Sequence, residues 1–355
     1  GVDVSDLEVK EIDGGEYVVA MVRTEGRYTI EVLEETFPEI IAGLKFSKTM
    51  RWNTTGVAFS RPVRWYVALF GNAIIPFEYA GVFSSNVTHG LRPYGSLPQV
   101  VKEPLDYFDA VGKQNIHLEY GERRDAIIQQ ITALAAEIGG TIPDDPGLLD
   151  EVVNLVEAPT AFRGQFNEDY LQLPRDVLVT VMRKHQRYFP VEDANGQLMP
   201  YFIAVRNGDD QHVDKVIAGN EAVLRARFSD ANFFYREDRK KTLKDFLPRL
   251  ATLTFEEHLG SMLDKNNRVA MLVPKVGDLL GMTATDIAVA ERAAHIAKAD
   301  LATQMVVEMT SLQGAMGREY AKLEDQPDDV ADAIYEHWQP RNADDTSPAS
   351  TPGVL

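Results

Sequence analysis

Residues 178–208, LVTVMRKHQRYFPVEDANGQLMPYFIAVRNG, contain the pattern that decides the fold. The stretch opens like the end of a helix, and two runs rich in β-branched and aromatic residues follow, from Arg187 to Val191 and from Met199 to Val205. Asn195 and Gly196 stand between the runs, and both residue types tolerate the positive φ of a tight turn. The stretch therefore predicts a helix followed by a β-hairpin.

Basic residues crowd this hairpin and the helix expected after it. From Arg183 to Arg249 the sequence has thirteen Lys or Arg and ten Asp or Glu, whereas the whole chain carries a formal net charge of −18. The candidate phosphate-binding residues in this window are Arg183, Lys184, Arg187, Arg206, Arg225, Arg227, Lys240 and Lys241. The alternative is a pair of solvated helix faces, in which the cations pair with acids at helical spacing or complement a helix dipole.

Aromatic residues are interleaved with these cations. They are Tyr188, Phe189, Tyr201, Phe202, Phe233, Phe234 and Tyr235. Bases of single-stranded nucleic acids stack on such side chains, so the mixture is compatible with a nucleic-acid surface. Aromatic residues at these spacings also form cores, and the pattern alone leaves both interpretations open.

The composition is that of an ordinary globular protein of 355 residues, which is long enough for two or three domains. The chain has no cysteine, which excludes disulfides and thiolate metal sites and fits a reducing cytoplasm. It has no long apolar run and no basic-then-apolar leader, so we expect neither a membrane span nor a signal peptide. The pI near 4.8 argues against general attraction to DNA, and a polyanion must therefore be bound at a local patch.

Upstream of the hairpin, strand and helix patterns alternate. The sequence predicts a strand in residues 14–26, a helix in 29–46 interrupted by Pro38, a β-rich block in 50–83 with a turn at Gly71-Asn72, a helix in 121–138 that ends at Gly139, a short helix after Pro146 and a strand in 158–166. This order predicts an α+β domain over residues 1–210, in which helices cover a mixed sheet. A division into two subdomains near residues 100–150 is the alternative.

From about Val213 the pattern is helical with almost no strand signal. Ser229-Asp230 is a candidate cap for the second of three helices, Pro248 marks a kink, and a long helix is expected over residues 283–309. These patterns predict a helical domain over residues 211–341. The Ser/Pro-rich residues 342–355 are expected to form a flexible tail.

Four blocks of the sequence resemble the β subunit of the heteromeric bacterial glycyl-tRNA synthetases. They are residues 48–77 (KTMRWNTTGVAFSRPVRWYVALFGNAIIPF), 182–208 (MRKHQRYFPVEDANGQLMPYFIAVRNG), 216–241 (VIAGNEAVLRARFSDANFFYREDRKK) and 299–321 (ADLATQMVVEMTSLQGAMGREYA). The resemblance extends from about Gly15 to Arg341. Because the β subunit of that family is longer, the resemblance implies that this chain is a fragment.

The resemblance carries several expectations. The α+β part is similar to the B3/B4-like domain of phenylalanyl-tRNA synthetase, and the helical part is similar to a degenerate HD domain. The implied function is that of a non-catalytic, cytoplasmic subunit of glycine-tRNA ligase, which binds and positions tRNA(Gly) for glycylation and docks to a catalytic α subunit in an α2β2 assembly. ATP and Mg²⁺ are then expected at the α subunit, and no catalytic residue, metal or cofactor is expected in this chain.

A metal-dependent HD phosphohydrolase is the alternative of a different class. Such enzymes need an adjacent His-Asp pair, and none of the seven histidines precedes an aspartate. Ala299-Asp300 stands where the pair is expected, and one carboxylate cannot replace the ligand set, so Asp300, Lys298 and His295 are interpreted as a polar remnant in a packed bundle. A scaffold that only docks the α subunit is a further alternative.

One short motif is interpreted as a chance resemblance to an ATP-binding element. Residues 234–238, FYRED, resemble the aromatic-Arg-x-acid element with which class II synthetases hold ATP, but no Gly-rich element ending in Arg follows. The run fits a solvated helix face better.

Overall fold

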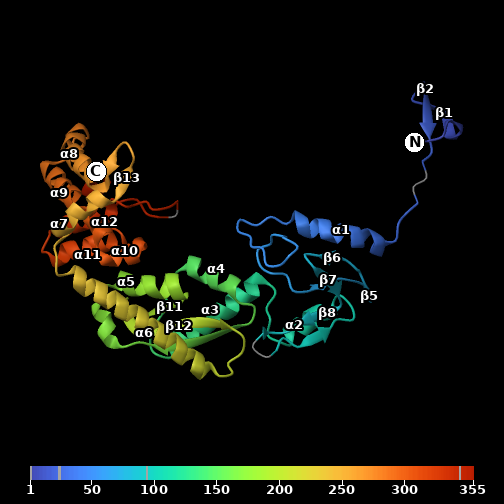
Figure 1. Ribbon diagram of the computed structural model, residues 1–355, viewed down its shortest axis with the longest axis horizontal. Helices are drawn as coiled ribbons and strands as arrows, with labels where there is room; N and C mark the ends of the chain where they lie inside the picture. The colour runs from blue at the N-terminus through green and yellow to red at the C-terminus, as the bar shows by residue number, and fades with distance from the viewer. Residues whose placement is uncertain (1, 23–24, 93–94, 344) are drawn as a thin grey trace. The chain divides into compact units, whose positions relative to one another are not determined.

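The computed structural model describes residues 2–22, 25–92, 95–343 and 345–355 (Figure 1). The chain forms two compact units, Gly1–Ile116 and His117–Leu355. Both units contain helices and strands, which confirms the α+β class. The domain boundary at residue 210 and the identities of the two predicted domains remain predictions. Within the described residues, no helix has both the length and the apolar character that spanning a membrane requires.

The first unit combines helices with small sheets. Its elements are η1 (Val4–Asp6), β1 (Leu7–Ile12), β2 (Gly15–Ala20), α1 (Thr29–Gly43), β3 (Tyr66–Val67), β4 (Leu69–Phe70), β5 (Ala73–Ile74), β6 (Glu78–Tyr79), β7 (Val82–Ser85), β8 (Val87–His89), β9 (Pro98–Val100) and α2 (Asp106–Gly112). β7 pairs in parallel with β3 and antiparallel with β6, so this small sheet is mixed. β4 and β5 form the hairpin predicted at Gly71-Asn72.

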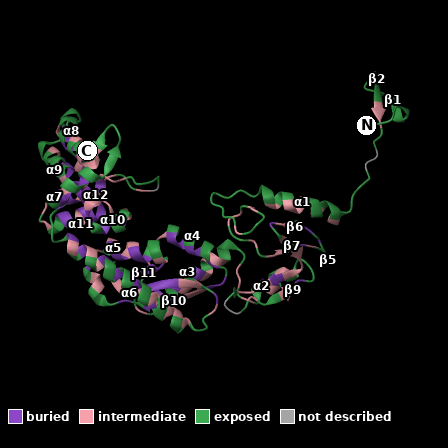
Figure 2. Ribbon diagram, viewed as in Figure 1, coloured by how far each residue is buried: buried purple, intermediate pink, exposed green. Residues whose placement is uncertain are grey.

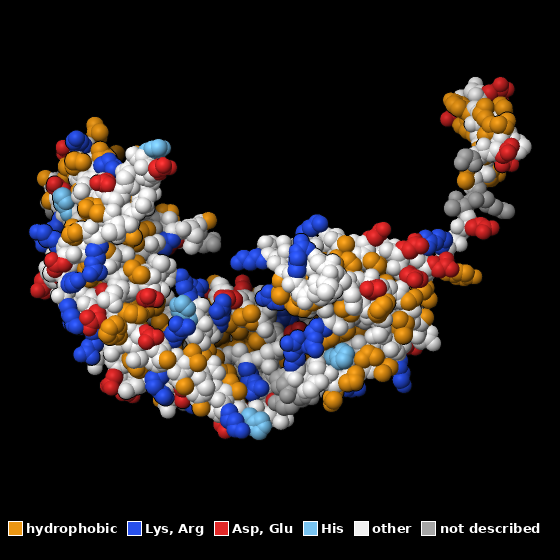
Figure 3. Space-filling view, viewed as in Figure 1, with side chains coloured by type: hydrophobic (Ala, Val, Ile, Leu, Met, Phe, Trp, Pro, Cys, Tyr) orange, Lys and Arg blue, Asp and Glu red, His pale blue; other side chains and the backbone are white. Residues whose placement is uncertain are grey.

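The hairpin of β1 and β2 lies largely exposed (Figure 2). Val9 and Val18 face each other across the two strands and are 66% and 68% exposed. Hydrophobic side chains of this hairpin are accordingly visible at the surface in Figure 3. The strand predicted over residues 14–26 contains β2, but β1 was not predicted, although the apolar and charged residues at the start of Leu7–Ile12 alternate as in a strand.

Helix α1 passes through Pro38, so the prediction that Pro38 interrupts it was wrong. Leu33, Phe37 and Ile41 lie at helical spacing and pack against the small core formed by Ala68, Ile75 and Phe77. This packing outweighs the loss of one backbone hydrogen bond at the proline.

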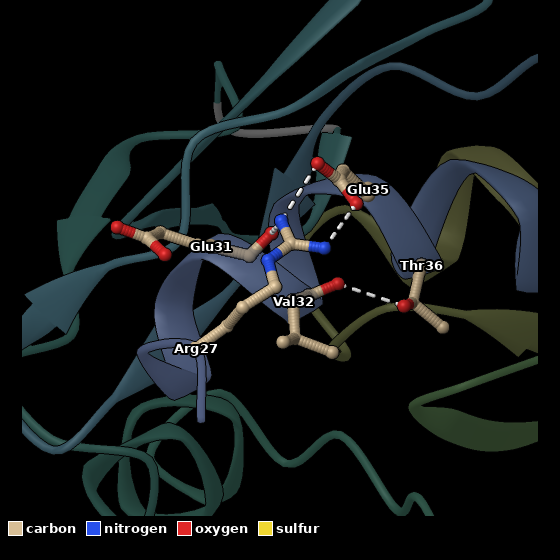
Figure 4. A network of polar contacts seen from close by, with 5 residues as sticks. All are labelled: Arg27, Glu31, Val32, Glu35 and Thr36. Atoms are coloured by element: carbon tan, nitrogen blue, oxygen red, sulfur yellow. Dashed lines mark hydrogen bonds and ion pairs between the residues drawn. The ribbon is translucent and has the colours of Figure 1, made fainter. Parts of the chain in front are cut away.

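Arg27, which precedes α1, forms hydrogen bonds with residues of this helix (Figure 4). Its guanidinium donates to both carboxylate oxygens of Glu35, at 2.8 and 2.7 Å, and to the carbonyl of Glu31 at 3.4 Å. The hydrogen bond and the charge of Glu35 raise the pKa of Arg27, and the same pair lowers the pKa of Glu35. Because the pair is exposed, it fixes the direction of the chain more than it stabilises the fold.

The second unit is built on an antiparallel sheet in the order β10-β12-β11. Its first elements are α3 (Tyr120–Ala136), α4 (Pro146–Leu155), β10 (Pro159–Gln165), η3 (Glu168–Gln172), α5 (Arg175–Thr180), the π-helical turn η4 (Val181–Gln186), β11 (Phe189–Glu192), β12 (Leu198–Asn207) and α6 (Val213–Asp238). β11 and β12 form the predicted hairpin, with Gly196 at φ 74° in its turn. The helix predicted over residues 121–138 is present as α3, but it ends at Ala136 with Glu137 as its C-cap, and Gly139 at φ 70° lies in the turn that follows. The strand predicted over residues 158–166 is confirmed as β10.

Successive residues of β12 point to opposite faces of this sheet and enter different cores. Ile203 packs with α3 and α4, beside residues such as Ile127 and Val153. Phe202 and Ala204 join the larger core on the other face, which α5, α6 and the later helices share. Figure 2 shows that buried residues are frequent along the strands of this sheet. The sheet therefore holds helices on both faces.

The remaining elements are mainly helical. They are α7 (Leu243–Phe246), η5 (Leu247–Thr252), β13 (Thr254–Glu256), β14 (Gly260–Ser261), α8 (Met262–Leu279), α9 (Ala284–Ile296), η6 (Ala299–Ala302), α10 (Gln304–Glu308), η7 (Thr310–Leu312), α11 (Ala315–Leu323), α12 (Asp328–Glu336) and α13 (Thr351–Val354). In residues 342–355, Ser350 caps α13 and its backbone N–H donates to Glu336 at 3.0 Å.

Three local expectations for this part were wrong. The hairpin of β13 and β14 interrupts the predicted all-helical pattern, because Gly260 at φ 83° allows a turn there. Ser229-Asp230 lies inside α6 and caps nothing. The long helix expected over residues 283–309 begins at the Thr283 cap as predicted but breaks after Ile296, where Asp300 is buried in a 3-10 turn.

Asp238 joins the end of α6 to the later helices. It is only 2% exposed. Its carboxylate accepts hydrogen bonds from the backbone N–H groups of Gln304 at 2.8 Å and Met305 at 2.9 Å, and from the hydroxyl of Tyr320 at 3.0 Å. Tyr320 in turn stacks on Tyr235, with ring centroids 6.0 Å apart. The interpretation of residues 234–238 as a solvated helix face was therefore wrong for Tyr235 and Asp238.

Replacing Asp238 by Asn tests this junction. The amide offers one acceptor oxygen and places an NH₂ group against a backbone donor, so we expect the variant to lose about 2–4 kcal/mol of unfolding free energy. Urea denaturation followed by circular dichroism measures the loss. The neighbouring Glu237→Gln change removes only the surface pair with Lys240 and should cost less than about 0.5 kcal/mol. Equal losses in both variants would contradict the assigned role.

Candidate nucleic-acid interface

A π-helical turn places the basic residues that precede the hairpin, Arg183, Lys184, His185 and Arg187, at the surface. α5 continues into Val181–Gln186, and Arg187 ends the turn in the left-handed region at φ 56°. The N–H of Tyr188 donates to the carbonyl of Met182 at 3.0 Å, which closes the widened turn. Val181 and Met182 are buried by this arrangement, whereas the four residues 183–185 and 187 are exposed.

Cations from two elements meet around His185. Burial lowers the pKa of His185, and the charges of Arg227, Lys184 and Arg187 lower it further. Arg227 belongs to α6, while the other two cations belong to the hairpin entrance. We refer to Lys184, His185, Arg187 and Arg227 as the His185 cluster. The fold thus concentrates positive charge from separate parts of the sequence at one place.

Two of the predicted arginines are also held by acids. Arg183 Nε lies 2.5 Å from Asp145, and Arg187 Nε lies 2.7 Å from Glu151. These arginine side chains are 45% and 43% exposed, and pairs at that exposure contribute at most about 1 kcal/mol. A phosphate can therefore compete with the carboxylates for either guanidinium.

A groove of about 640 Å³ follows the outer face of the C-terminal half of α6. Its lining consists of Ser229, Asn232, Phe233, Arg236, Glu237, Arg239 and Lys240, and we call it the α6 groove. These residues recur at three- and four-residue steps, opposite the buried stripe that includes Phe228, Ala231 and Tyr235. The groove offers three cations and one acid. Lys240 contacts that acid, Glu237, at 2.5 Å.

The remaining predicted cations lie apart from the His185 cluster and the groove. Arg206 donates to the carbonyl of Gln211 at 3.0 Å. Arg225 is exposed one helical turn before Ser229, on the same face as the groove. Lys241 lies over the ring of Phe246, with Nζ 5.9 Å from the centroid. The prediction had chosen Lys240 and passed over Arg236 and Arg239, although helical spacing carried the signal: Arg236 follows Asn232 by four residues, and Arg239 follows Arg236 by three.

The aromatic residues of this region divide between core and surface. Tyr188, Phe189, Phe202 and Tyr235 are buried, and Tyr188 stacks on Phe202 with centroids 4.5 Å apart. Burial raises the pKa of Tyr188 to about 12, and its hydroxyl donates to the side-chain oxygen of Asn220. Phe233, in contrast, is 57% exposed within the α6 groove. For the buried four, the core interpretation is the correct one.

Asp300 occupies the interior of the helical part. It is fully buried, and its Oδ2 accepts hydrogen bonds from the backbone N–H groups of Gly314 at 2.6 Å and Gly317 at 3.2 Å. Lys298 is half-buried beside it, whereas His295 is exposed and does not share this interior. In the described ranges, no three His, Cys, Asp or Glu side chains are grouped so that they could hold a metal ion.

The pH dependence of stability tests the state of Asp300. Burial raises its pKa to about 6, against hydrogen bonds and the charge of Lys298 that lower it. Between pH 4 and 6 the folded state therefore keeps a proton that the unfolded state releases, and stability from this group falls as the pH rises. The Asp300→Asn variant has no carboxyl group to titrate here and does not show this loss. Its free energy of unfolding, relative to that of the parent, should therefore rise by up to about 3 kcal/mol from pH 4 to 7. Urea denaturation across that range measures the difference, and a constant difference would contradict the assignment.

Comparison with known proteins places the chain in a family. The family model described as glycyl-tRNA synthetase beta subunit matches residues 1–355. The chain is 44% identical over 355 residues to the glycine--tRNA ligase beta subunit of Halalkalibacterium halodurans, 44% identical over 356 residues to that of Clostridioides difficile and 45% identical over 355 residues to that of Desulforamulus reducens. Each match covers 100% of this chain and 51% of the relative, so the chain spans about half the length of these relatives. The chain belongs to the glycyl-tRNA synthetase beta subunit family.

Proposed function

We propose that this chain contributes tRNA binding and positioning to a glycine-tRNA ligase, through the His185 cluster and the α6 groove. The observation that carries the proposal is the local excess of exposed cations in a protein with a net charge of −18. The relatives are named as beta subunits of this ligase, and that name supports tRNA(Gly) as the polyanion of this proposal.

The two surfaces suit different parts of an RNA. Lys184, Arg187 and Arg227 of the His185 cluster are exposed, so their guanidinium and ammonium groups can contact backbone phosphates. The α6 groove adds the exposed ring of Phe233 to Arg236, Arg239 and Lys240, so an unstacked base and its neighbouring phosphates can be held together. Such contacts fix the orientation of a tRNA, and orientation itself lowers the barrier of a reaction that takes place elsewhere.

The chemistry of glycylation belongs, in this proposal, to a companion catalytic α subunit. ATP and Mg²⁺ act there, and the described residues of this chain serve in docking and positioning within an α2β2 assembly in the cytoplasm. The B3/B4-like assignment of the α+β part and the HD-like assignment of the helical part belong to the same proposal.

Charge removal on the two surfaces tests the proposal. The triple variants Lys184→Gln/Arg187→Gln/Arg227→Gln and Arg236→Gln/Arg239→Gln/Lys240→Gln should each bind tRNA(Gly) at least tenfold more weakly. Because each lost phosphate contact lowers the slope of log affinity against log salt concentration by about 0.7–0.9, the slope should fall by about 2–3. Fluorescence anisotropy with labelled tRNA at several salt concentrations measures both quantities.

A matched control carries the same change of charge in the first unit, in Lys10→Gln/Lys102→Gln/Lys113→Gln, and should keep the parent affinity and slope. Circular dichroism confirms that each variant is folded. If the control weakens binding as much as the two test variants, net charge rather than a defined surface governs the interaction, and the proposal fails.

A further inference from the structure

A second group of polar side chains converges on a small cavity of about 70 Å³ among the later helices. Lys265 and Asn266 reach it from α8, Lys298 from the turn after α9, and His337 from the end of α12. The rest of the lining is mainly apolar, with alanines such as Ala294 and Ala297. None of these residues belongs to the His185 cluster or the α6 groove.

The two lysines bring like charges together without a carboxylate between them. Neither forms an ion pair within 4.0 Å of an acid among the described residues. Lys298 Nζ lies 3.4 Å from the ring centroid of Trp338, and Lys265 Nζ lies 4.2 Å from that of Phe255. Burial and, to a smaller extent, the charge of Lys265 lower the pKa of Lys298 to about 8. Two such cations at a partly dehydrated cavity repel each other unless an anion lies there.

Neighbouring polar atoms also lack partners. Both ring nitrogens of His337 and the indole Nε1 of Trp338 are buried and form no hydrogen bond with the described residues. Burial and the nearby lysines lower the pKa of His337 to about 3, although the carbonyls of Ile334 and Ala333 act in the opposite direction. The imidazole is therefore neutral at pH 7 and keeps one N–H to donate. Buried donors without partners commonly mark the place of a bound ion or water.

Asp300 does not supply the missing acceptor. Its Oδ2 is occupied by the N–H groups of Gly314 and Gly317. Its Oδ1 finds no hydrogen-bond donor in the part of the chain that the structure describes, and its charge raises the pKa of Lys298 without an ion pair to it there. The carboxylate is thus close enough to offset part of the positive charge but leaves the ammonium group without a direct acceptor.

We propose that this cavity binds one tetrahedral oxyanion of the phosphate class, held by Lys265, Lys298 and the N–H of His337. The volume exceeds what a single water needs and is too small for a nucleoside. A phosphate offers several acceptor oxygens to donors that otherwise have none, and its charge removes the repulsion between the lysines. The source is either inorganic phosphate or the terminal phosphate of a larger molecule.

Trp338 provides a direct readout, because Lys298 lies against its ring. The chain has three tryptophans, and Trp52→Phe/Trp65→Phe leaves Trp338 as the only one. The fluorescence of this parent is titrated with sodium phosphate at constant pH, against sodium chloride at matched ionic strength. We expect a saturable change with phosphate alone, and a rise in the thermal unfolding midpoint under the same conditions.

Lysine substitutions locate the site. Lys298→Met and Lys265→Met, made in the parent, should each raise the phosphate midpoint, the phosphate concentration that gives half of the fluorescence change, at least tenfold. Lys275→Met makes the same change at an exposed position of α8 and should leave the midpoint unchanged. Methionine keeps most of the buried volume, and circular dichroism checks the fold of each variant. A response to phosphate no different from that to chloride, or an unchanged midpoint in Lys298→Met, would overturn the proposal.

Competition identifies the source of the phosphate. A short RNA with a 5′-phosphate and the same RNA with a 5′-hydroxyl are added to the phosphate-bound parent. Displacement by the phosphorylated RNA alone assigns a terminal phosphate, and displacement by neither assigns the free ion. Equal displacement by both would overturn the proposal, because the site would then respond to any polyanion. The lysine variants leave both proposed tRNA surfaces unaltered, so failure here does not affect the proposed function.

Discussion

The burial of one carboxylate, that of Asp238, constrains the arrangement of the second unit. A charged group in the interior is costly unless hydrogen bonds replace its hydration, and Asp238 obtains them from two backbone N–H groups and a tyrosine hydroxyl. The three donors come from α10 and α11, 66 to 82 residues further along the chain. The carboxylate therefore sets where α6 ends against the later helices. The shared core around Phe228 and Met305 depends on this position.

Fixing α6 also fixes the proposed RNA surface. One face of the helix contributes Leu224, Phe228 and Tyr235 to the core, so its opposite face must be exposed. The same face carries the α6 groove, while Arg227 reaches the cations of the hairpin entrance. Charges beyond a Debye length of about 8 Å are largely screened at physiological salt, so the acidic remainder of the chain does not cancel a local patch. An acidic protein can in this way present a defined basic surface.

Local pattern predicted those parts of the fold that depend on neighbours in sequence. The Asn195-Gly196 turn, the stripe of Ile127 and Ile131 and the turn at Gly139 after the helix all follow from short-range rules. Such rules do not predict contacts between residues that are far apart in the sequence. Residues 234–238 look like a solvated run because nothing nearby shows that Asp238 finds its donors at Gln304, Met305 and Tyr320. Pro38 is tolerated for a similar reason, since the core that holds α1 comes from residues 68–77.

The candidate site was only partly predictable for the same physical reason. Charge composition located the basic window, but whether a cation is available depends on acids elsewhere, such as Asp145 for Arg183 and Glu151 for Arg187. The sequence also did not predict which aromatic residues are buried and which are exposed. Tyr188 and Phe233 have similar surroundings in the sequence, yet the first stacks inside the core and the second lies exposed in the groove.

The buried carboxylates of Asp238 and Asp300 differ in how many of their oxygens accept hydrogen bonds. This difference separates a structural role from a role in binding. Asp238 has donors on both oxygens, and a fully bonded buried group needs nothing further. Among the described residues, Asp300 has donors on one oxygen only, and the ring nitrogens of His337 and the indole Nε1 of Trp338 also lack hydrogen-bond partners. An anion cannot satisfy the free oxygen of Asp300, which needs a donor, but it can accept from the N–H of His337 at the cavity that Lys265 and Lys298 also line. Since Lys298 and Lys265 both bring positive charge to that cavity, the ion that satisfies them is an anion.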